Sequence, residues 1–342
     1  MGIKKIKHLD EPCNFKQLSE VLPLEVPLSL LIDPSSVCNF KCSFCPTGHP
    51  QMLAKAARPN GMMNFDLFCK IVDDVQKFDK KLEKINLCKD GEPFLNKNLV
   101  KMVAYAKKKD IANNISITSN GALINEFDAR GLIDAGLDSI RISIEHVDDA
   151  GYKKVTNTPT KYEHVRRNVE YLFNEKRKRK SGLKIYAKLI DTGLSDFEKK
   201  KFTDDFSGIS DFININPVDG RSNSQGYDFT LGQGISSATA YANTMSKMDR
   251  QVCPHPFYSM AINFNGSVSV CCIDWGFNVI IGNVNKESLV DIWRGKKLRN
   301  FRMLHLKGER KKINICADCH VVIGSPVESD IDGVANSLLA VY

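Results

Sequence analysis

Apolar and polar positions along the first two thirds of the chain alternate between two periods. Short apolar runs of strand length cover residues 28–32, 84–87, 114–118, 139–144, 183–190 and 212–215. Between them, apolar residues recur at helical spacing over residues 65–75, 99–107, 124–135, 162–173 and 196–206. Strands that alternate with helices favour a parallel sheet covered by helices, an α/β fold. Six strands are fewer than the eight that close a full barrel.

The pattern is weaker at both ends of the chain. We interpret residues 1–26 as a leader that packs on the barrel, and residues 221–249, which are rich in glycine and serine, as a linker or loop. Further on, a hairpin is predicted over residues 262–270, because Asn265-Gly266 is the strongest short hairpin signal. A helix is predicted from Asp291. We therefore expect a small domain of hairpin plus helix over residues 250–322, and a tail over residues 323–342.

The first group of cysteines follows the first predicted strand. Cys38, Cys42 and Cys45 have the spacing C-x3-C-x2-C, and Phe44 precedes the third. Three thiolates on one loop can hold three irons of a [4Fe–4S] cluster and leave the fourth iron open to a small molecule. A zinc site normally closes its coordination with a fourth residue. A zinc knuckle or three unrelated buried thiols are the alternatives.

A second group of cysteines, Cys253, Cys271, Cys316 and Cys319, lies near the C-terminus. Four thiolates close a metal site completely, and a structural zinc ribbon is the alternative to an iron–sulfur cluster, because zinc also prefers four thiolates with a C-x2-C pair. Cys272 is adjacent to Cys271 and could replace it, although strand alternation points one of the two away.

The C-x3-C-x2-C loop with Phe44 resembles the signature of the radical S-adenosylmethionine (radical SAM) enzymes. In that family the open iron chelates SAM, whose cleavage gives a 5′-deoxyadenosyl radical that abstracts hydrogen from a substrate. The resemblance implies a partial (β/α)6 TIM-like barrel over residues 27–220, with Cys38, Cys42 and Cys45 as ligands of a SAM-binding [4Fe–4S] cluster.

The resemblance also assigns SAM contacts that follow the second and third strands. Gly91-Glu92-Pro93 stands where the family has a Gly-Gly-Glu type of motif that binds the SAM amino group, with Asp90 in place of the first glycine. Thr118-Ser119-Asn120-Gly121 resembles a Thr-Asn-Gly turn of the family, so that Ser119 and Asn120 are candidate ligands of the SAM carboxylate or ribose. A plain Asn-Gly turn is the alternative.

Two further strands end in candidate SAM contacts. Ser143 and Glu145 belong to a Ser-Ile-Glu stretch that is similar to one in the family and implies contacts to the ribose. Lys188 lies among apolar neighbours in the fifth strand, where a lysine needs a partner. It either meets the SAM carboxylate or points outwards.

The order of the C-terminal motifs resembles the auxiliary-cluster domain (SPASM) of radical SAM enzymes. Because no further cysteine follows Cys319, the chain resembles the shortened version, called twitch, with one auxiliary [4Fe–4S] cluster. The arrangement of the four cysteines is similar to that of the 2-deoxy-scyllo-inosamine dehydrogenases, which oxidise a secondary alcohol to a ketone.

Charge and composition narrow the range of partners. The net charge is +8, and the basic residues are concentrated in runs at residues 107–109, 176–180, 199–201 and 310–312. These runs are either solvated helix ends or the source of a positive field that attracts an anionic substrate. No basic patch is interleaved with aromatic residues, so nucleic acid is not an expected partner. No apolar run is long enough to span a membrane. The chain begins without a secretory signal and carries thiolate ligands that need a reducing compartment, so we expect a cytoplasmic protein.

These features together predict a radical SAM oxidoreductase. It would oxidise or otherwise modify a sugar, cyclitol or nucleotide-sugar, with the auxiliary cluster as electron acceptor and a flavodoxin- or ferredoxin-type protein as electron donor. Arg221, just beyond the sixth strand, is the candidate catalytic residue that could face the substrate; a solvated loop arginine is the alternative.

Two other functions stay open at this point. One is a maturase that modifies a ribosomally made peptide; such enzymes often carry seven auxiliary cysteines and an N-terminal peptide-recognition domain, and residues 1–26 are too short for that domain. The other is an iron–sulfur carrier or zinc-binding adaptor. The open three-cysteine site argues against it, because a carrier gains nothing from an unligated iron.

Overall fold

The computed structural model describes residues 17–218, 231, 250–319 and 321–342. Its sheet contains six parallel strands whose order in space follows the sequence, which confirms the predicted α/β partial barrel. These strands are β1 (Ser29–Ile32), β2 (Leu82–Leu87), β3 (Ala112–Ser119), β4 (Ser139–Ile144), β5 (Lys184–Asp191) and β6 (Phe212–Pro217).

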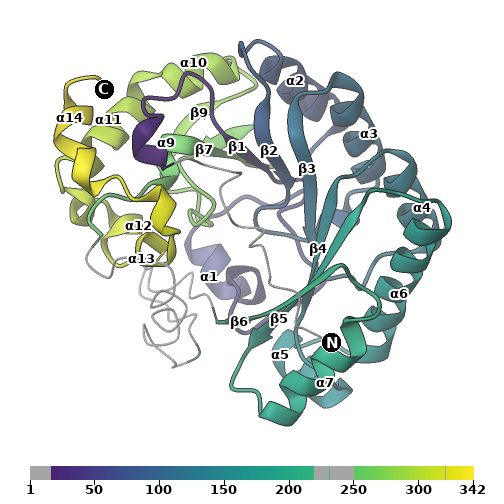
Figure 1. Ribbon diagram of the computed structural model, residues 1–342. Coiled ribbons are helices and arrows are strands. Elements are labelled where there is room, and N and C mark those ends of the chain that lie inside the picture. The colour runs from purple at the N-terminus through teal and green to yellow at the C-terminus, as the bar shows by residue number, and fades with distance from the viewer. Residues whose placement is uncertain (1–16, 219–230, 232–249, 320) are drawn as a thin grey trace.

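Helices lie along the outer side of this curved sheet (Figure 1). All five predicted helices are present: α2 (Phe65–Val75), α3 (Leu99–Lys109), α4 (Glu126–Asp134), α6 (Tyr162–Lys178) and α7 (Asp196–Phe206). Helix α2 begins at the expected cap, because the Asn64 side chain accepts a hydrogen bond from the Asp66 amide. Two short helices were not predicted, α1 (Pro50–Lys55) and α5 (Asp149–Thr156). Both are too short for a helical period to stand out.

The predicted C-terminal hairpin forms, and it extends the barrel sheet. Strand β8 (Ser267–Ser269) pairs antiparallel with β7 (Ser259–Ile262) on one side and with β9 (Ile280–Asn283) on the other. Gly266 in the turn has a φ of +85°, a conformation that glycine adopts without strain. Strand β7 pairs in parallel with β1, so the nine strands have the order β6-β5-β4-β3-β2-β1-β7-β8-β9. The two regions with cysteine groups therefore share one continuous sheet.

Short helices follow the hairpin and surround it. Helix α10 (Leu289–Arg294) begins two residues before the predicted start, and α11 (Lys296–Leu306) was not predicted. The remaining helices are α9 (His255–Tyr258), α12 (Asn314–Ala317), α13 (Val321–Gly324) and α14 (Ala335–Leu339). The 3-10 turns are Leu18–Glu20, Pro46–Gly48, Pro93–Leu95, Arg310–Lys312, Val327–Ser329 and Asp332–Val334. No helix in the described ranges is long and apolar enough to cross a membrane.

The described part of the leader contacts the C-terminal helices. Leu18 is buried in a hydrophobic cluster with Phe257 of α9, Leu306 of α11 and Leu338 of α14. The Trp293 indole N–H donates to the Leu24 carbonyl at 3.0 Å. Leu24 also packs against the main hydrophobic core. The interpretation of residues 1–26 as a leader on the barrel stays a prediction, because residues 1–16 lie outside the described residues.

Candidate functional site

The three-cysteine loop lies at the carboxyl end of β1, where parallel-sheet enzymes place their chemistry. Helix α5, which the sequence did not predict, holds this loop: the amides of Lys41 and Ser43 donate to the Thr156 and Val155 carbonyls at 2.8 and 3.0 Å. The loop therefore has a fixed backbone before any ligand binds.

The thiols of this loop fit a shared metal centre. Cys38, Cys42 and Cys45 are all free. Burial raises the pKa of Cys38 to about 12 and also raises that of Cys42, and in each case the neighbouring thiols of the group add to the rise. Three thiols this close resist ionisation together unless a cation joins them. The irons of a cluster would supply that positive charge.

Glu92 joins the second and third motifs. Its carboxylate accepts hydrogen bonds from the Ser119 hydroxyl at 2.8 Å, from the Asn120 amide at 2.8 Å and from the Phe94 amide at 3.0 Å. The side chain is fully buried, and burial raises its pKa to about 7, while these three hydrogen bonds lower it. Glu92 and Ser119, both predicted to contact SAM, thus bond to each other and fix the two turns.

Asn120 connects the same turns to the cysteine loop. Its Nδ2 donates to Asn39 Oδ1 at 2.8 Å and lies 3.8 Å from Cys38 Sγ. Gly91 approaches the loop more closely still, since a Cβ at this position would lie 2.1 Å from the Ser35 carbonyl oxygen. Pro93 begins the 3-10 turn that follows. The structure therefore brings three predicted motifs together at the ends of β1, β2 and β3.

Glu145 follows β4 directly and lies within electrostatic reach of Lys188 on β5. Burial raises the pKa of Glu145 to about 7, and the Lys188 ammonium lowers it. The Glu145 carboxylate in turn raises the pKa of Cys42, so it lies near the cysteine loop. Ser143 is the register partner of Lys188. Phe44, by contrast, packs half-buried against the main hydrophobic core.

The network around Glu92 predicts the effect of a conservative change. In Glu92→Gln an amide N–H₂ replaces one acceptor oxygen and leaves a buried donor unsatisfied, which costs about 1–3 kcal/mol. We expect SAM cleavage, measured as 5′-deoxyadenosine formed per minute, to fall about tenfold to a hundredfold. Glu163→Gln, an exposed glutamate on α6, is the matched control. Equal rates for the two variants would contradict this role of Glu92.

A buried cluster of charged residues lies beside this site, and sequence reasoning missed it. The Asp90 carboxylate pairs with Lys89 at 2.5 Å and with Arg58 at 3.4 Å, and the Asp90 amide donates to Asp33 at 3.3 Å. The Phe277 ring lies 4.9 Å from the Lys89 ammonium and 5.5 Å from the Arg58 guanidinium. Adjacent charges after a buried strand, Lys89-Asp90, were the one signal in the sequence. The cluster links the end of β2 to the segment after Cys271, because Lys89 Nζ also donates to the Asp274 carbonyl at 3.2 Å.

Asp33 gives this cluster a pH dependence. Burial first and the Asp90 carboxylate second raise the pKa of Asp33 to about 7, so the folded protein keeps the proton to a higher pH than the unfolded chain does. The stability from that proton is fully present below the unfolded pKa of 3.8 and is lost progressively as pH rises to about 7. Asp33→Asn stays neutral at every pH, so its unfolding temperature relative to wild type should rise between about pH 4 and 7 and then level off, by the equivalent of a few kcal/mol at most. A constant or falling difference would contradict the assignment.

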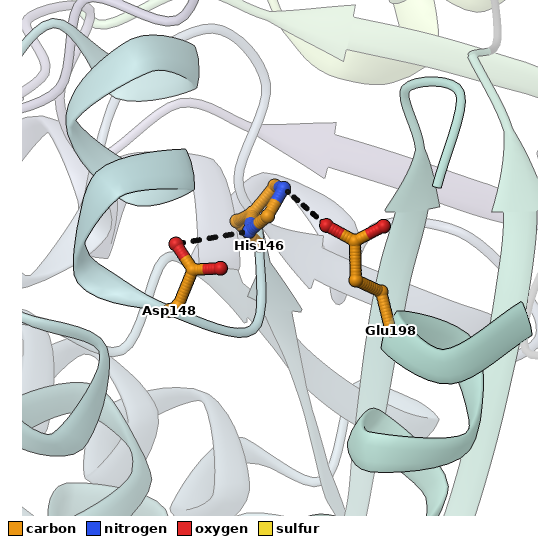
Figure 2. Close-up of side chains that lie close together, drawn as sticks. All are labelled: His146, Asp148 and Glu198. Carbon is orange, nitrogen blue, oxygen red and sulfur yellow. Dashed lines mark ion pairs between the residues drawn. The ribbon is translucent and has the colours of Figure 1, made fainter. Parts of the chain in front are cut away.

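His146, just after β4, has two carboxylates near it (Figure 2). Asp148 lies 3.6 Å from Nδ1, and Glu198 of α7 lies 3.4 Å from Nε2. One ligand atom from each of the three side chains lies within 4.8 Å of the other two, a spacing that a single metal ion could span. The group also links the turn before α5 to the start of α7.

The second cysteine group lines one cavity. Cys253, Cys271, Cys316 and Cys319 all contribute to its wall, and its empty volume, which includes space open to solvent, is about 410 Å³. The other lining residues are His255, Pro256, Ile273, Phe301, His305, Arg310, Ile315, Val321 and Val322. Cys272 is not part of this wall. The structure therefore favours Cys271 in the choice that the sequence left open.

The electrostatics of this cavity also fit a bound cluster. Burial raises the pKa of Cys316 to about 12, with a further rise from Cys319, and it raises that of Cys271 and Cys253 as well. The Arg310 guanidinium lowers the pKa of Cys253 and Cys316. Cys319 raises the pKa of each of the other three thiols, so the four are close enough to share a positively charged centre. Arg221, the predicted catalytic residue, lies outside the described residues.

Comparison with known families places both cysteine groups in recognised domains. Residues 32–187 match the radical SAM superfamily, and residues 253–320 match the iron–sulfur cluster-binding domain SPASM. These matches confirm the expected cofactors, namely a SAM-binding [4Fe–4S] cluster, SAM and an auxiliary cluster.

The proteins that are similar to this chain have different names and bound molecules. A probable GTP 3′,8-cyclase of Methanococcus maripaludis is 34% identical over 119 residues, which are 35% of this chain and 37% of the relative. The match thus spans little more than a third of the relative's length. A solved structure of BtrN with AdoMet and 2-DOIA has a TM-score of 0.54 at 18% identity, over 86% of this chain and 93% of that one. Streptococcus suis SuiB bound to its precursor peptide has a TM-score of 0.64 at 17% identity, over 90% and 72%.

Proposed function

We propose that this radical SAM enzyme, which carries a C-terminal SPASM domain, oxidises or otherwise modifies a hydroxylated sugar, cyclitol or nucleotide-sugar. When bound, the SAM cluster supplies the electron that cleaves SAM to a 5′-deoxyadenosyl radical, and the auxiliary cluster accepts the electron that the oxidised substrate gives up. The proposal rests mainly on the cavity whose wall contains all four cysteines of the C-terminal group. Four thiolates complete the coordination of one cluster, which suits an electron acceptor better than a substrate-binding centre.

The residues of the barrel hold SAM in this proposal. Cys38, Cys42 and Cys45 hold the SAM cluster, and α5 fixes their loop. Glu92, through its bonds to Ser119 and Asn120, holds the turns around the SAM amino group.

Two further groups of residues act on the ribose and the substrate in this proposal. Ser143, Glu145 and Lys188 lie on the neighbouring strands, where a buried carboxyl and an ammonium offer contacts to the ribose and the carboxylate. Arg221 stays the proposed catalytic contact to the substrate.

Several observations support the substrate class. The net charge of +8 favours an anionic substrate. The name of the M. maripaludis relative places a nucleotide in its site, and BtrN, a 2-deoxy-scyllo-inosamine dehydrogenase, aligns over most of both chains. We further propose that the enzyme is cytoplasmic and receives electrons from a flavodoxin- or ferredoxin-type protein.

A deuterium-transfer assay tests the proposal. The anaerobic holoenzyme is incubated with SAM, a strong reductant and a panel of sugars, cyclitols and nucleotide-sugars, each deuterated at its carbinol carbons. We expect one panel member to lose two hydrogens, with its deuterium recovered in 5′-deoxyadenosine at one equivalent per product. Oxidation leaves one hydrogen atom on 5′-deoxyadenosine, one proton in solvent and one electron for the auxiliary cluster.

Peptide modification is the second candidate, because the fold is also similar to that of SuiB, whose structure holds a precursor peptide. The same assay separates the two functions when candidate peptides are added to the panel. Turnover of a peptide together with inactivity towards every hydroxylated sugar would overturn the first proposal.

A further inference from the structure

The wall of the four-cysteine cavity contains a buried nitrogen without a partner. His305, on α11, lines the cavity and is fully buried. Its Nδ1 accepts a hydrogen bond from the Cys253 amide at 3.4 Å. Its Nε2 is buried and has no hydrogen-bond partner within the described part of the chain. A buried polar atom of this kind needs an explanation, since leaving it unsatisfied costs about 1–3 kcal/mol.

The hydrogen bond at Nδ1 decides where the ring proton lies. A nitrogen that accepts a hydrogen bond carries no proton, so a neutral imidazole holds its proton on Nε2. Because Nδ1 accepts the hydrogen bond from the Cys253 amide, the ring is neutral and Nε2 is its N–H donor. The Phe301 ring packs at a centroid distance of 4.9 Å. His305 is therefore a neutral N–H donor at the edge of the cavity.

We propose that His305 donates a hydrogen bond from Nε2 to a sulfur of the auxiliary cluster and thereby raises the reduction potential of that cluster. A donor stabilises the more negative, reduced form of a cluster more than the oxidised form. The inference rests on the proposed function, in which this cluster must accept an electron. It identifies His305 as the residue that makes the acceptor easier to reduce.

Direct ligation of iron by His305 is the other possibility, and the geometry disfavours it. A ligating Nε2 needs a lone pair, so the proton would move to Nδ1. There it would face the N–H of Cys253, and two donors would meet at 3.4 Å. The four cysteines already supply the four ligands that a cubane requires.

A redox titration tests the proposal. The full-length chain with Cys38→Ala, Cys42→Ala and Cys45→Ala leaves the auxiliary cluster as the only iron–sulfur centre, and its reduced form is followed by EPR at set potentials. In this background His305→Leu removes the donor, His305→Gln keeps an N–H of similar reach, and Phe301→Leu alters the packing around the ring without removing a donor. All are compared with His305 intact.

We expect His305→Leu to lower the ratio of reduced to oxidised cluster about tenfold at the wild-type midpoint potential. For a one-electron couple this corresponds to a midpoint potential about 59 mV lower. His305→Gln should recover most of this difference, and Phe301→Leu should change it little. An unshifted potential in His305→Leu, or an equal shift in Phe301→Leu, would overturn the proposal.

A second readout needs no substitution at His305 and so does not depend on the folding of a variant. In the background that retains His305, pulsed EPR should detect an exchangeable proton and a weakly coupled histidine nitrogen at the auxiliary cluster. A strongly coupled nitrogen would identify a ligand, and no coupling would exclude the hydrogen bond; either result overturns the proposal. Zinc in place of iron at this site would instead refute the electron acceptor itself.

Discussion

Replacing Cys38, Cys42 and Cys45 together by alanine is expected to reduce 5′-deoxyadenosine formation to background while about four irons stay bound. SAM cleavage needs the open iron of the cluster that these three thiols hold, and the other cysteine group lines a separate cavity. Iron, acid-labile sulfide and 5′-deoxyadenosine are measured after anaerobic reconstitution.

Cys69→Ala on α2 is the control for this variant, because Cys69 is a free thiol outside both groups. It should keep about eight irons and the wild-type rate. Residual SAM cleavage in the triple variant, above the level of protein-free controls, would show that the catalytic cluster lies elsewhere.

Replacing Cys271 by alanine should remove the other cluster and leave SAM cleavage intact. We expect the iron content to fall to about four and substrate oxidation to stop, while 5′-deoxyadenosine still forms. The reason is that Cys271 lines the auxiliary cavity and the barrel cluster is untouched.

The neighbouring thiol supplies a matched control at the next position. Cys272→Ala should keep about eight irons, because Cys272 is not part of the cavity wall. Loss of iron in Cys272→Ala, with none in Cys271→Ala, would identify Cys272 as the ligand and contradict the structure.

The features that the sequence predicts well are local ones. A strand or helix shows its period within a few residues, and the candidate ligands Cys38, Cys42 and Cys45 lie on one loop. The grouping of the C-terminal cysteines can also be predicted from their order in the sequence. Only the structure shows that Cys271, and not Cys272, lines the shared cavity.

The features that were missed depend on contacts between distant segments. Strand β7 pairs with β1, more than 200 residues earlier, and no local pattern encodes this choice. The ion cluster brings together Asp33, Arg58 and Asp90 from three segments. His305 carries no signal in the sequence, and it becomes a candidate only when its unpartnered nitrogen is seen in the wall of the cavity.

The partners of Glu92 show a different limit. Its motif predicts a contact to SAM, which stays a prediction, and the structure adds hydrogen bonds from Ser119 and Asn120 that the motif does not indicate. Sequence position identifies the residues that meet at a site, whereas the direction of each side chain depends on neighbours from other strands.

The central claim is that the chain holds two cubane clusters, one that cleaves SAM and one that accepts an electron. The most direct measurement is anaerobic reconstitution of the full chain, followed by counts of iron, sulfide and zinc and by incubation with SAM and a strong reductant. The account predicts about eight irons together with 5′-deoxyadenosine. About four irons with one zinc would remove the electron acceptor, and the absence of SAM cleavage would contradict the account as a whole.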